Sequence, residues 1–424
     1  MKSSAYNYYL PYDGGVIFMN GITESSFWVE EAKSDIYRAI IENPNEYELQ
    51  AAKFIDRMKS RGFILEDTAD EDKLVARKYE ALQNKGEYLI MILPTYSCNL
   101  RCWYCVQSHK NEWLQSEQYE SLKALIKTNL SNPEIDSLRI SWFGGEPILA
   151  YDSILKFTTE MRDFAVAEGK SFRCGITSNA TLLDEDKIEA FKAAGVDFYQ
   201  ITIDGDQEAH DKVKQLNGAS AFERTMRNIA SIAKHTHCVL RFNYGRKTLY
   251  SPSLIDDVTR YLPPEVRKNI SINFQPVWQE SFDEEDFQQV VKLMEAAKQH
   301  GLSSTHKTGG LCYVDQAHFD CVYPSGEVGK CENDAEGMAK GHLMPGGKVN
   351  WDNADTFHYI HNSVLTDSEC KSCRYLPLCW GPCSRNRFTQ LKDSGKITCF
   401  RSDDNNSINE LIRNIFISQK YIHV

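Results

Sequence analysis

The strongest constraint on the fold is an alternation of short apolar runs and helix-like segments, which begins near residue 87. Six strand-like runs follow one another at 88–93, 138–143, 172–177, 198–203, 239–243 and 270–274. Amphipathic segments lie between them at 117–130, 153–167, 185–194, 221–234 and 253–262. Strands that alternate with helices form βαβ units and a parallel sheet. The sequence therefore predicts an α/β fold in which six such units form a partial or complete (β/α)6 barrel.

Two stretches of the 424-residue chain fall outside this alternation. Residues 1 to about 85 contain a hairpin signal at Asp13-Gly14-Gly15, two helical stretches and a short closing strand at 63–65. This pattern predicts a small winged-helix-like domain. A helix at 284–300 leads into a Cys-, Gly- and Pro-rich tail, which is typical of a region organised by metal. We therefore expect three domains, at 1–85, 86–305 and 306–424.

Composition and charge argue against several classes of protein. The formal net charge of −11 disfavours a chain-wide surface for nucleic acid. No apolar run approaches the roughly 18 residues that a membrane helix needs, and residues 1–7 have no apolar signal core. We therefore expect a cytoplasmic protein without nucleic-acid or membrane partners. In a reducing cytosol, 13 cysteines predict metal binding or catalysis rather than disulfides.

Three of the cysteines, Cys98, Cys102 and Cys105, follow the first barrel strand in C-x3-C-x2-C spacing. Three thiolates can hold a four-iron cluster and leave its fourth iron open to a small molecule. A zinc site that lacks one ligand is the alternative. The position favours a functional site, because parallel barrels place their sites at the carboxyl ends of strands.

A second set of eight cysteines lies in the tail. Cys312, Cys321 and Cys331 come first, followed by Cys370-x2-Cys373-x5-Cys379-x3-Cys383 and finally Cys399. Two structural zinc ions, one for each half of the four-cysteine run, would satisfy this spacing. Eight thiolates would also ligate two four-iron clusters completely. The remaining pair, Cys174 and Cys238, is expected to be buried in strands without a role.

The first motif closely resembles that of the radical S-adenosylmethionine (SAM) superfamily, which implies that Tyr104 lies near the adenine of SAM. The segment 143–147 is similar to the family's GGEP segment, in which Gly144, Gly145 and Glu146 would receive the methionine amino group. Glycine allows close backbone approach and a carboxylate matches an ammonium group. Weaker matches at strand ends imply further SAM contacts for Ser178, Asn179, Asp204, Arg241 and Asn243.

The tail is similar to the SPASM extension of radical SAM enzymes. The resemblance implies three [4Fe-4S] clusters, one that binds SAM and two auxiliary ones. The outer auxiliary cluster would take Cys370, Cys373, Cys379 and Cys399, and the inner one Cys312, Cys331 and Cys383. Cys321 is the fourth inner ligand by count, yet it departs from the family pattern. If Cys321 faces the core of a hairpin that turns at 324–326, the inner cluster has an open site, and the sequence leaves both readings open.

The resemblance implies an enzyme that cleaves SAM reductively and abstracts a hydrogen with the 5′-deoxyadenosyl radical. SPASM proteins act mostly on peptides, and the N-terminal domain resembles winged-helix domains that bind a leader peptide by adding a strand to a sheet edge. We therefore expect a maturase that forms a thioether or C–C crosslink in a ribosomally made precursor peptide, with a flavodoxin or ferredoxin as electron donor. The alternatives are an anaerobic sulfatase-maturing, formylglycine-generating enzyme and a non-enzymatic, zinc-bound interaction module. The sequence names no catalytic base, although Gln275, Tyr313, Asp315 and Asp320 could line a pocket.

Overall fold

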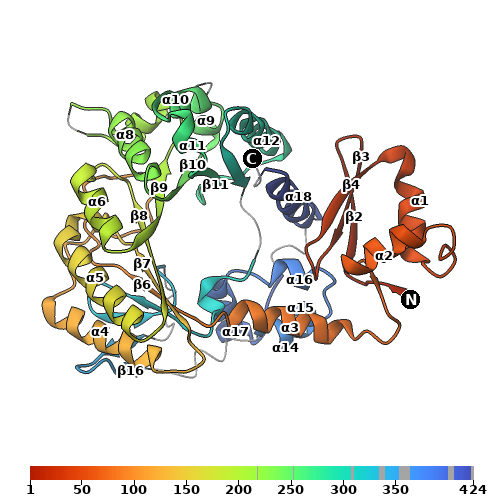
Figure 1. Ribbon diagram of the computed structural model, residues 1–424, viewed down its shortest axis with the longest axis horizontal. Helices are drawn as coiled ribbons and strands as arrows, with labels where there is room; N and C mark the ends of the chain where they lie inside the picture. Colours follow the sequence, from red (N-terminus) through yellow and green to blue (C-terminus); the bar gives the residue numbers. More distant parts are fainter. Residues whose placement is uncertain are drawn as a thin grey trace. The chain divides into compact units, whose positions relative to one another are not determined.

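The computed structural model describes residues 1–216, 218–251, 253–306, 310–333, 340–352, 363–399 and 405–421. Contacts divide the chain into two compact units. The first, here called the terminal unit, comprises Met1–Lys85, Thr308–Ala317 and Asp355–Lys420. The second, the barrel unit, comprises Gly86–Lys307, His318–Ala354 and Tyr421–Val424. The βα repeats thus form one unit, whereas the N-terminal residues and most of the tail share the other (Figure 1).

The barrel unit is built on parallel strands that follow chain order in the sheet. These are β6 (Glu87–Ile92), β7 (Ser137–Trp142), β8 (Ser171–Ser178), β9 (Val196–Ile203), β10 (His237–Tyr244), β11 (Ile270–Pro276) and β12 (Ser303–His306). Their main helices are α4 (Ser116–Leu130), α5 (Tyr151–Ala167), α6 (Glu185–Ala193), α8 (Ala221–Ala233), α10 (Leu254–Tyr261) and α12 (Glu284–Gln299). The central parallel sheet confirms the predicted α/β class, and β12 is a strand that the sequence analysis did not anticipate.

Burial alternates along the strands, which gives the sheet two different faces. In β7, Leu138, Ile140 and Trp142 are fully buried, whereas the residues between them are partly exposed. Residues of neighbouring strands that pair in register share a face, so Arg241 of β10 lies beside Thr202 of β9. The helices lie along one face of the sheet (Figure 1). The opposite face is polar and partly exposed, and it carries most of the predicted site residues.

The tail returns to the barrel unit through a short antiparallel extension of the same sheet. Strand β13 (Phe319–Val322) pairs in parallel with β6, and β14 (Glu327–Gly329), β15 (Gly341–Leu343) and β16 (Val349–Trp351) follow in antiparallel order. Cys321 lies in β13 opposite Gly329 and is fully buried. Its environment is therefore that of a core residue in the β13–β14 hairpin, and its ligation stays a prediction.

The terminal unit begins with an antiparallel sheet of β2 (Asn7–Tyr12), β3 (Gly15–Asn20) and β4 (Ser26–Glu30). Asp13 and Gly14 connect the first two strands with φ angles of +48° and +68°, as a two-residue hairpin turn requires. Helices α1 (Glu31–Glu42), α2 (Ala52–Ser60) and α3 (Glu71–Gln83) follow, and β5 (Ile64–Leu65) pairs with β1 (Lys2–Ser3). The description of this segment as a winged helix remains a prediction.

One hydrophobic core of the terminal unit joins the N-terminal sheet to the tail. Its members include Tyr8 and Ile17 from the sheet, Tyr79 from α3, Trp380, and Ile412 from α18 (Asn405–Tyr421). The rings of Tyr79 and Trp380 lie 5.2 Å apart. The first 85 residues therefore supply side chains that the tail needs for its own packing. In the part of the chain that the structure describes, no helix combines the length and apolar composition that crossing a bilayer requires.

Candidate active site

The three cysteines of the barrel lie on the loop that follows β6, with Cys98 and Cys102 half-buried and Cys105 exposed. Burial is the main cause that raises the pKa of the Cys102 thiol to about 11. Lys214 opposes this rise, and Asp204, Cys105 and Cys98 add to it. The sulfurs are thus close enough to influence one another, and a bound metal would have to displace their protons.

The spacing of these thiols bears on the kind of metal that would fit. Among the described residues, no three Cys, His, Asp or Glu side chains converge closely enough to hold a single metal ion. An iron–sulfur cluster attaches each thiolate to a different iron, so its ligands stand farther apart than those of one zinc ion. Three thiolates satisfy three irons of a four-iron cluster, whereas a structural zinc ion takes four protein ligands, so the donor set of the loop fits a cluster.

Gly144 and Gly145 are required because the turn after β7 presses against the cysteine loop. The N–H of Gly145 donates to Thr95 O at 3.0 Å, and that of Glu146 donates to Ser97 O at 2.9 Å. A Cβ atom on Gly145 would lie 2.2 Å from Ser97 O. Gly144 has a φ of +122°, and a Cβ there would lie 2.5 Å from Thr95 O. The glycine pair thus holds the cysteine loop in place through backbone contacts.

Glu146 is fully buried and its carboxylate binds donors of its own chain. One oxygen, Oε1, accepts from Ile148 N–H at 3.0 Å and from the Ser178 hydroxyl at 2.8 Å, and Oε2 accepts from Asn179 N–H at 2.9 Å. Burial raises the pKa of this carboxyl group. The contacts fasten the turn after β7 to the end of β8. The predicted role of Glu146 toward the methionine amino group stays a prediction.

Asn179 connects the end of β8 to the first cysteine of the loop. Its side-chain amide donates to Asn99 Oδ1 at 3.0 Å and lies 3.9 Å from Cys98 Sγ. The N–H of Leu100 points at the same sulfur from 3.4 Å. Burial raises the pKa of the Cys98 thiol, and the N–H of Leu100 lowers it in part, toward the thiolate form that ligates iron.

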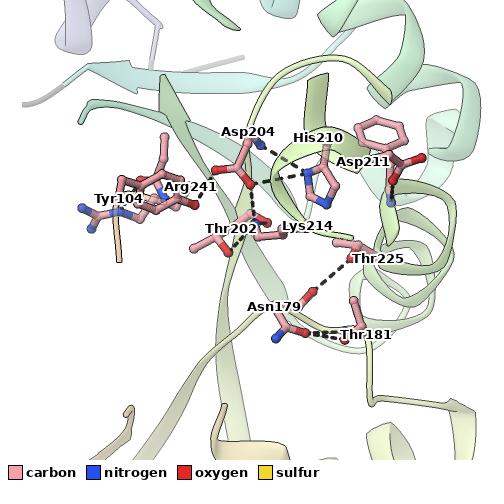
Figure 2. A network of polar contacts seen from close by, with 12 residues as sticks. Tyr104, Asn179, Thr181, Thr202, Asp204, His210, Asp211, Lys214, Thr225 and Arg241 are labelled. Atoms are coloured by element: carbon pink, nitrogen blue, oxygen red, sulfur yellow. Dashed lines mark hydrogen bonds and ion pairs between the residues drawn. The ribbon is translucent and has the colours of Figure 1, made fainter. Parts of the chain in front are cut away.

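Four of the residues predicted to contact SAM belong to one polar network on the partly exposed face of the sheet, and Figure 2 shows Tyr104, Asp204 and Arg241. The hydroxyl of Tyr104 donates to Asp204 Oδ1, and the amide of Asn243 donates to the Tyr104 hydroxyl at 3.3 Å. Arg241 Nε donates to Asn243 Oδ1 at 2.9 Å. Burial, and then the charge of Asp204, raises the pKa of Tyr104. The side chain of Tyr104 is thereby tied to β9 and β10.

Asp204 is held from its other side by Lys214 and His210, which were not among the predicted SAM contacts. Lys214 and Asp204 are both 1% exposed, and Lys214 Nζ lies 2.6 Å from Asp204 Oδ2. Lys214 also donates to Thr202 O at 2.7 Å. The Nδ1 atom of His210 accepts from Asp204 N–H at 3.2 Å, and burial lowers the pKa of this imidazole. His210 is therefore neutral, with its proton on Nε2.

The position of Lys214 in the sequence, four residues after His210, could have indicated that it is buried. Helix α7 spans Gln207–Val213, and Lys214 caps it four residues after His210. A spacing of four places two side chains on the same helix face. A lysine at this spacing from a histidine, just after a barrel strand, could have been marked as a buried pair.

In the terminal unit, Cys370 lies within electrostatic reach of the other three cysteines predicted for the outer cluster. Burial, then Asp367, and then Cys379, Cys373 and Cys399 together raise its pKa to about 12. Asp367 caps α15 (Ser368–Lys371), where its Oδ1 accepts from Cys370 N–H at 3.0 Å. Its Oδ2 accepts from Ile397 N–H at 3.2 Å. That these cysteines bind a cluster stays a prediction.

The remaining tail residues are divided between the units. Cys312 and Cys383 belong to the terminal unit, whereas Cys321 and Cys331 belong to the barrel unit. The four residues that could have lined a pocket are Gln275, Tyr313, Asp315 and Asp320. Asp320 accepts from the Tyr88 hydroxyl at 2.8 Å, Gln275 donates to Asn273 at 2.8 Å, and Asp315 is 2% exposed in the core of the terminal unit.

Comparisons with known proteins agree with this geometry. Residues 92–247 match the family model of the Radical SAM superfamily. The AdoMet-dependent heme synthase of Nitratidesulfovibrio vulgaris is 34% identical over 137 residues, which cover 32% of this chain and 34% of that protein. The Serine-type anaerobic sulfatase-maturating enzyme of Bacteroides thetaiotaomicron is 28% identical over 153 residues, or 34% of this chain and 36% of that protein. The chain thus spans about a third of the length of these two relatives.

Solved structures share the fold at low sequence identity. The structure of anSMEcpe with AdoMet and the Cp18Cys peptide has 18% identity and a TM-score of 0.57, and it covers 79% of this chain and 99% of its own. Streptococcus suis SuiB bound to the precursor peptide SuiA has 14% identity and a TM-score of 0.52, with 93% and 97% covered. The family match includes the cysteine loop and the ends of β6 to β10. Residues 92–247, which carry the cysteine loop and the polar network described above, therefore form a radical SAM domain.

Proposed function

We propose that the chain is a radical SAM maturase that introduces a thioether or C–C crosslink into a ribosomally made precursor peptide. A cluster on Cys98, Cys102 and Cys105 would supply reductive SAM cleavage and, with it, the 5′-deoxyadenosyl radical. The contacts described above keep this loop in one position, since Gly145 and Asn179 both bind it. The chain's own part is to hold SAM, orient the peptide and exclude water.

The partly exposed face of the barrel sheet is where we place the reacting segment of the peptide. Arg241 and Asn243 of β10 pair in register with Asn273 and Gln275 of β11. All four side chains are half-buried and polar, and they lie toward the carboxyl ends of their strands. Amide and guanidinium groups at this position can bind the backbone amides of an extended peptide.

The observation that carries the proposal is an open edge on the antiparallel sheet of the terminal unit. The N–H of Asn20 donates to Ser25 O at 3.0 Å, and that of Glu31 donates to Gly14 O at 3.3 Å. Since antiparallel partners alternate, the backbone groups of Trp28 and Glu30 point away from β3. No other strand of the described residues pairs with β4 on that side. Arg61 Nη2 already binds Ser26 O at the start of this edge at 2.6 Å, so the stretch left for pairing runs from Trp28 to Glu30. A leader peptide could add a strand there.

The opposite edge of this sheet is less suitable, because the tail covers it. Arg374 Nη2 donates to Asn7 O on β2 at 2.7 Å, and the Tyr375 ring stacks on Tyr8 at 5.3 Å. SuiB was solved with a precursor peptide, and its likeness to this chain supports a peptide of that kind as substrate. The match leaves 7% of the chain uncovered, which is fewer residues than the first 85. Part of the N-terminal segment therefore lies inside the matched region.

Glu30→Pro in the full chain tests the edge. Glu30 has φ −55° and ψ 137°, which proline adopts without strain, so the substitution removes one outward N–H and leaves the backbone in place. Glu30→Ala is the matched control, because it removes the same side chain and keeps the N–H. We expect the labelled precursor peptide encoded beside the gene to bind the proline variant about fivefold more weakly, the equivalent of one hydrogen bond of about 1 kcal/mol. Equal affinities for the two variants would exclude β4 as the docking edge.

A sulfatase-maturing activity is the second candidate. The fold likeness to anSMEcpe favours it, since 99% of that chain is covered. Oxidation of Cys or Ser to formylglycine creates an aldehyde, whereas a crosslink does not. Labelling of the product by an aldehyde-reactive hydrazide would therefore support this candidate against the maturase. Stoichiometric zinc without SAM cleavage would support the interaction module instead.

A further inference from the structure

A buried ion pair of the terminal unit lies next to two of the tail cysteines. Arg387 is 0% exposed, Ser384 1% and Asp315 2%. Arg387 Nη2 contacts Asp315 Oδ1 and donates to Ser384 Oγ at 3.0 Å, and Ser384 Oγ donates to Asp315 Oδ2 at 3.0 Å. Burying two charges is costly, and a pair of this kind persists only where hydrogen bonds satisfy both partners. The three side chains therefore form a fully dehydrated polar cluster with a fixed geometry.

Each charged residue of this cluster also binds the backbone of a cysteine. Cys312 precedes the 3-10 turn η2 (Tyr313–Asp315), and Asp315 N–H donates to Cys312 O at 3.0 Å. Cys383 precedes α17 (Ser384–Ser394), and Arg387 N–H donates to Cys383 O at 2.9 Å. The ion pair therefore joins two short turns, each of which begins at a cysteine.

We propose that Asp315, Ser384 and Arg387 form a clamp that fixes the spacing of Cys312 and Cys383 for an auxiliary iron–sulfur cluster. The clamp rests on the proposed function, because it assumes that these two cysteines are cluster ligands. Thiolates repel one another before iron binds, so ligands held at a set distance lower the cost of assembly. Polar groups behind metal ligands orient them in this way in many sites.

Two further observations fit this assignment. The Nε–H of Arg387 has no hydrogen-bond partner among the described residues, so one buried donor remains for an acceptor such as a cluster sulfur. Arg387 Nη1 also reaches Trp380 O at 3.4 Å, and Trp380 directly follows Cys379. The guanidinium thus contacts the chain beside a third tail cysteine. A matched positive and negative charge hold the turns together without adding net charge beside an anionic cluster.

The test is to remove the clamp without leaving an unpaired buried charge. The double variant Asp315→Leu with Arg387→Met replaces the ion pair by apolar side chains, which proteins often accept without loss of stability. Arg387→Lys keeps a positive charge opposite Asp315 and serves as the conservative rescue. The matched control is Asp286→Asn in α12, because Asp286 is also 2% exposed at its side chain and pairs with Arg246 at 3.1 Å, but belongs to the barrel unit and not to the unit of the clamp.

The readouts are iron per chain and electron paramagnetic resonance of anaerobically purified protein. Wild type and Asp286→Asn should carry about twelve irons, as three four-iron clusters require. The double variant should carry about eight irons per chain and keep the paramagnetic resonance signal that changes when SAM is added. Arg387→Lys should restore most of the roughly four irons that the double variant lacks. Full iron with unchanged spectra in the double variant would overturn the clamp while leaving the maturase proposal standing. A wild type with only about four irons would instead refute the auxiliary clusters, and the clamp with them.

Discussion

Gly145→Ala should separate the folding of the barrel from the assembly of its first cluster. The added Cβ would lie 2.2 Å from Ser97 O and 2.4 Å from Tyr96 O. Ordinary contacts between such atoms exceed about 3.2 Å, so the cysteine loop and the turn after β7 must separate by about 1 Å. That movement breaks the hydrogen bonds from Gly145 N–H to Thr95 O, 3.0 Å, and from Glu146 N–H to Ser97 O, 2.9 Å. At about 1 kcal/mol each, the loop loses about 2 kcal/mol of its anchoring.

The assay compares iron content and 5′-deoxyadenosine formation after anaerobic reconstitution. We expect Gly145→Ala to lose the SAM-dependent spectral change and most SAM cleavage, while the circular dichroism of the barrel stays unchanged. Gly169→Ala is the control, because Gly169 has a φ of +69° with no atom within 4 Å of its added Cβ, far from the loop in sequence. It should cost about 1 kcal/mol of backbone strain and no iron. A Gly145→Ala enzyme with full iron and wild-type SAM cleavage would refute the claim that this contact positions the cysteines.

Three further predictions concern single features. Replacing all three cysteines of the loop after β6 by Ala should remove about four irons per chain and abolish deoxyadenosine formation, and a triple variant that still cleaves SAM would contradict the assignment. Burial lowers the pKa of His210, so the folded protein favours the neutral imidazole. The stabilisation that follows is present in full above the unfolded-state pKa of about 6.5, and below that pH the free energy of unfolding should fall by about 1.4 kcal/mol per pH unit. Urea unfolding at pH 7.5 and 5.5 should show that His210→Gln flattens this slope, and parallel curves would disprove it. Asp367→Ala should lower iron content by about four per chain, because the caps on Cys370 and Ile397 are lost, whereas Asp184→Ala, which uncaps α6 instead, should not.

The sequence predicted the elements whose residues have a clear period. The six barrel strands were found because their apolar residues are buried against helices, as Ile140 and Trp142 are in β7. Strand β12 was missed because its buried residues are Ser304 and His306, which give no apolar signal. Strand β4 was missed because its five residues run directly into α1.

The sequence identified the residues of the candidate site where one short motif contains all of the residues that act together. The cysteine loop and the glycine pair are such cases, and Tyr104, Asp204, Arg241 and Asn243 also meet as part of one network. The ion pair of Asp315 with Arg387 could not be found, because its partners are 72 residues apart and each alone resembles an ordinary surface charge. Lys214 was missed because a lysine at a helix end is usually solvated, although its spacing of four from His210 was an available signal.

The core that the N-terminal sheet shares with the tail has a consequence during translation. Tyr79 leaves the ribosome about three hundred residues before Trp380, against which it packs. At about 5–20 residues per second, this interval lasts roughly 15–60 s. During that time the apolar faces of β2, β3 and α3 lack the side chains that cover them in the native protein. The nascent chain therefore has to be shielded from aggregation until its last hundred residues arrive, and slow codons or low chaperone supply before that point should reduce the yield of folded enzyme.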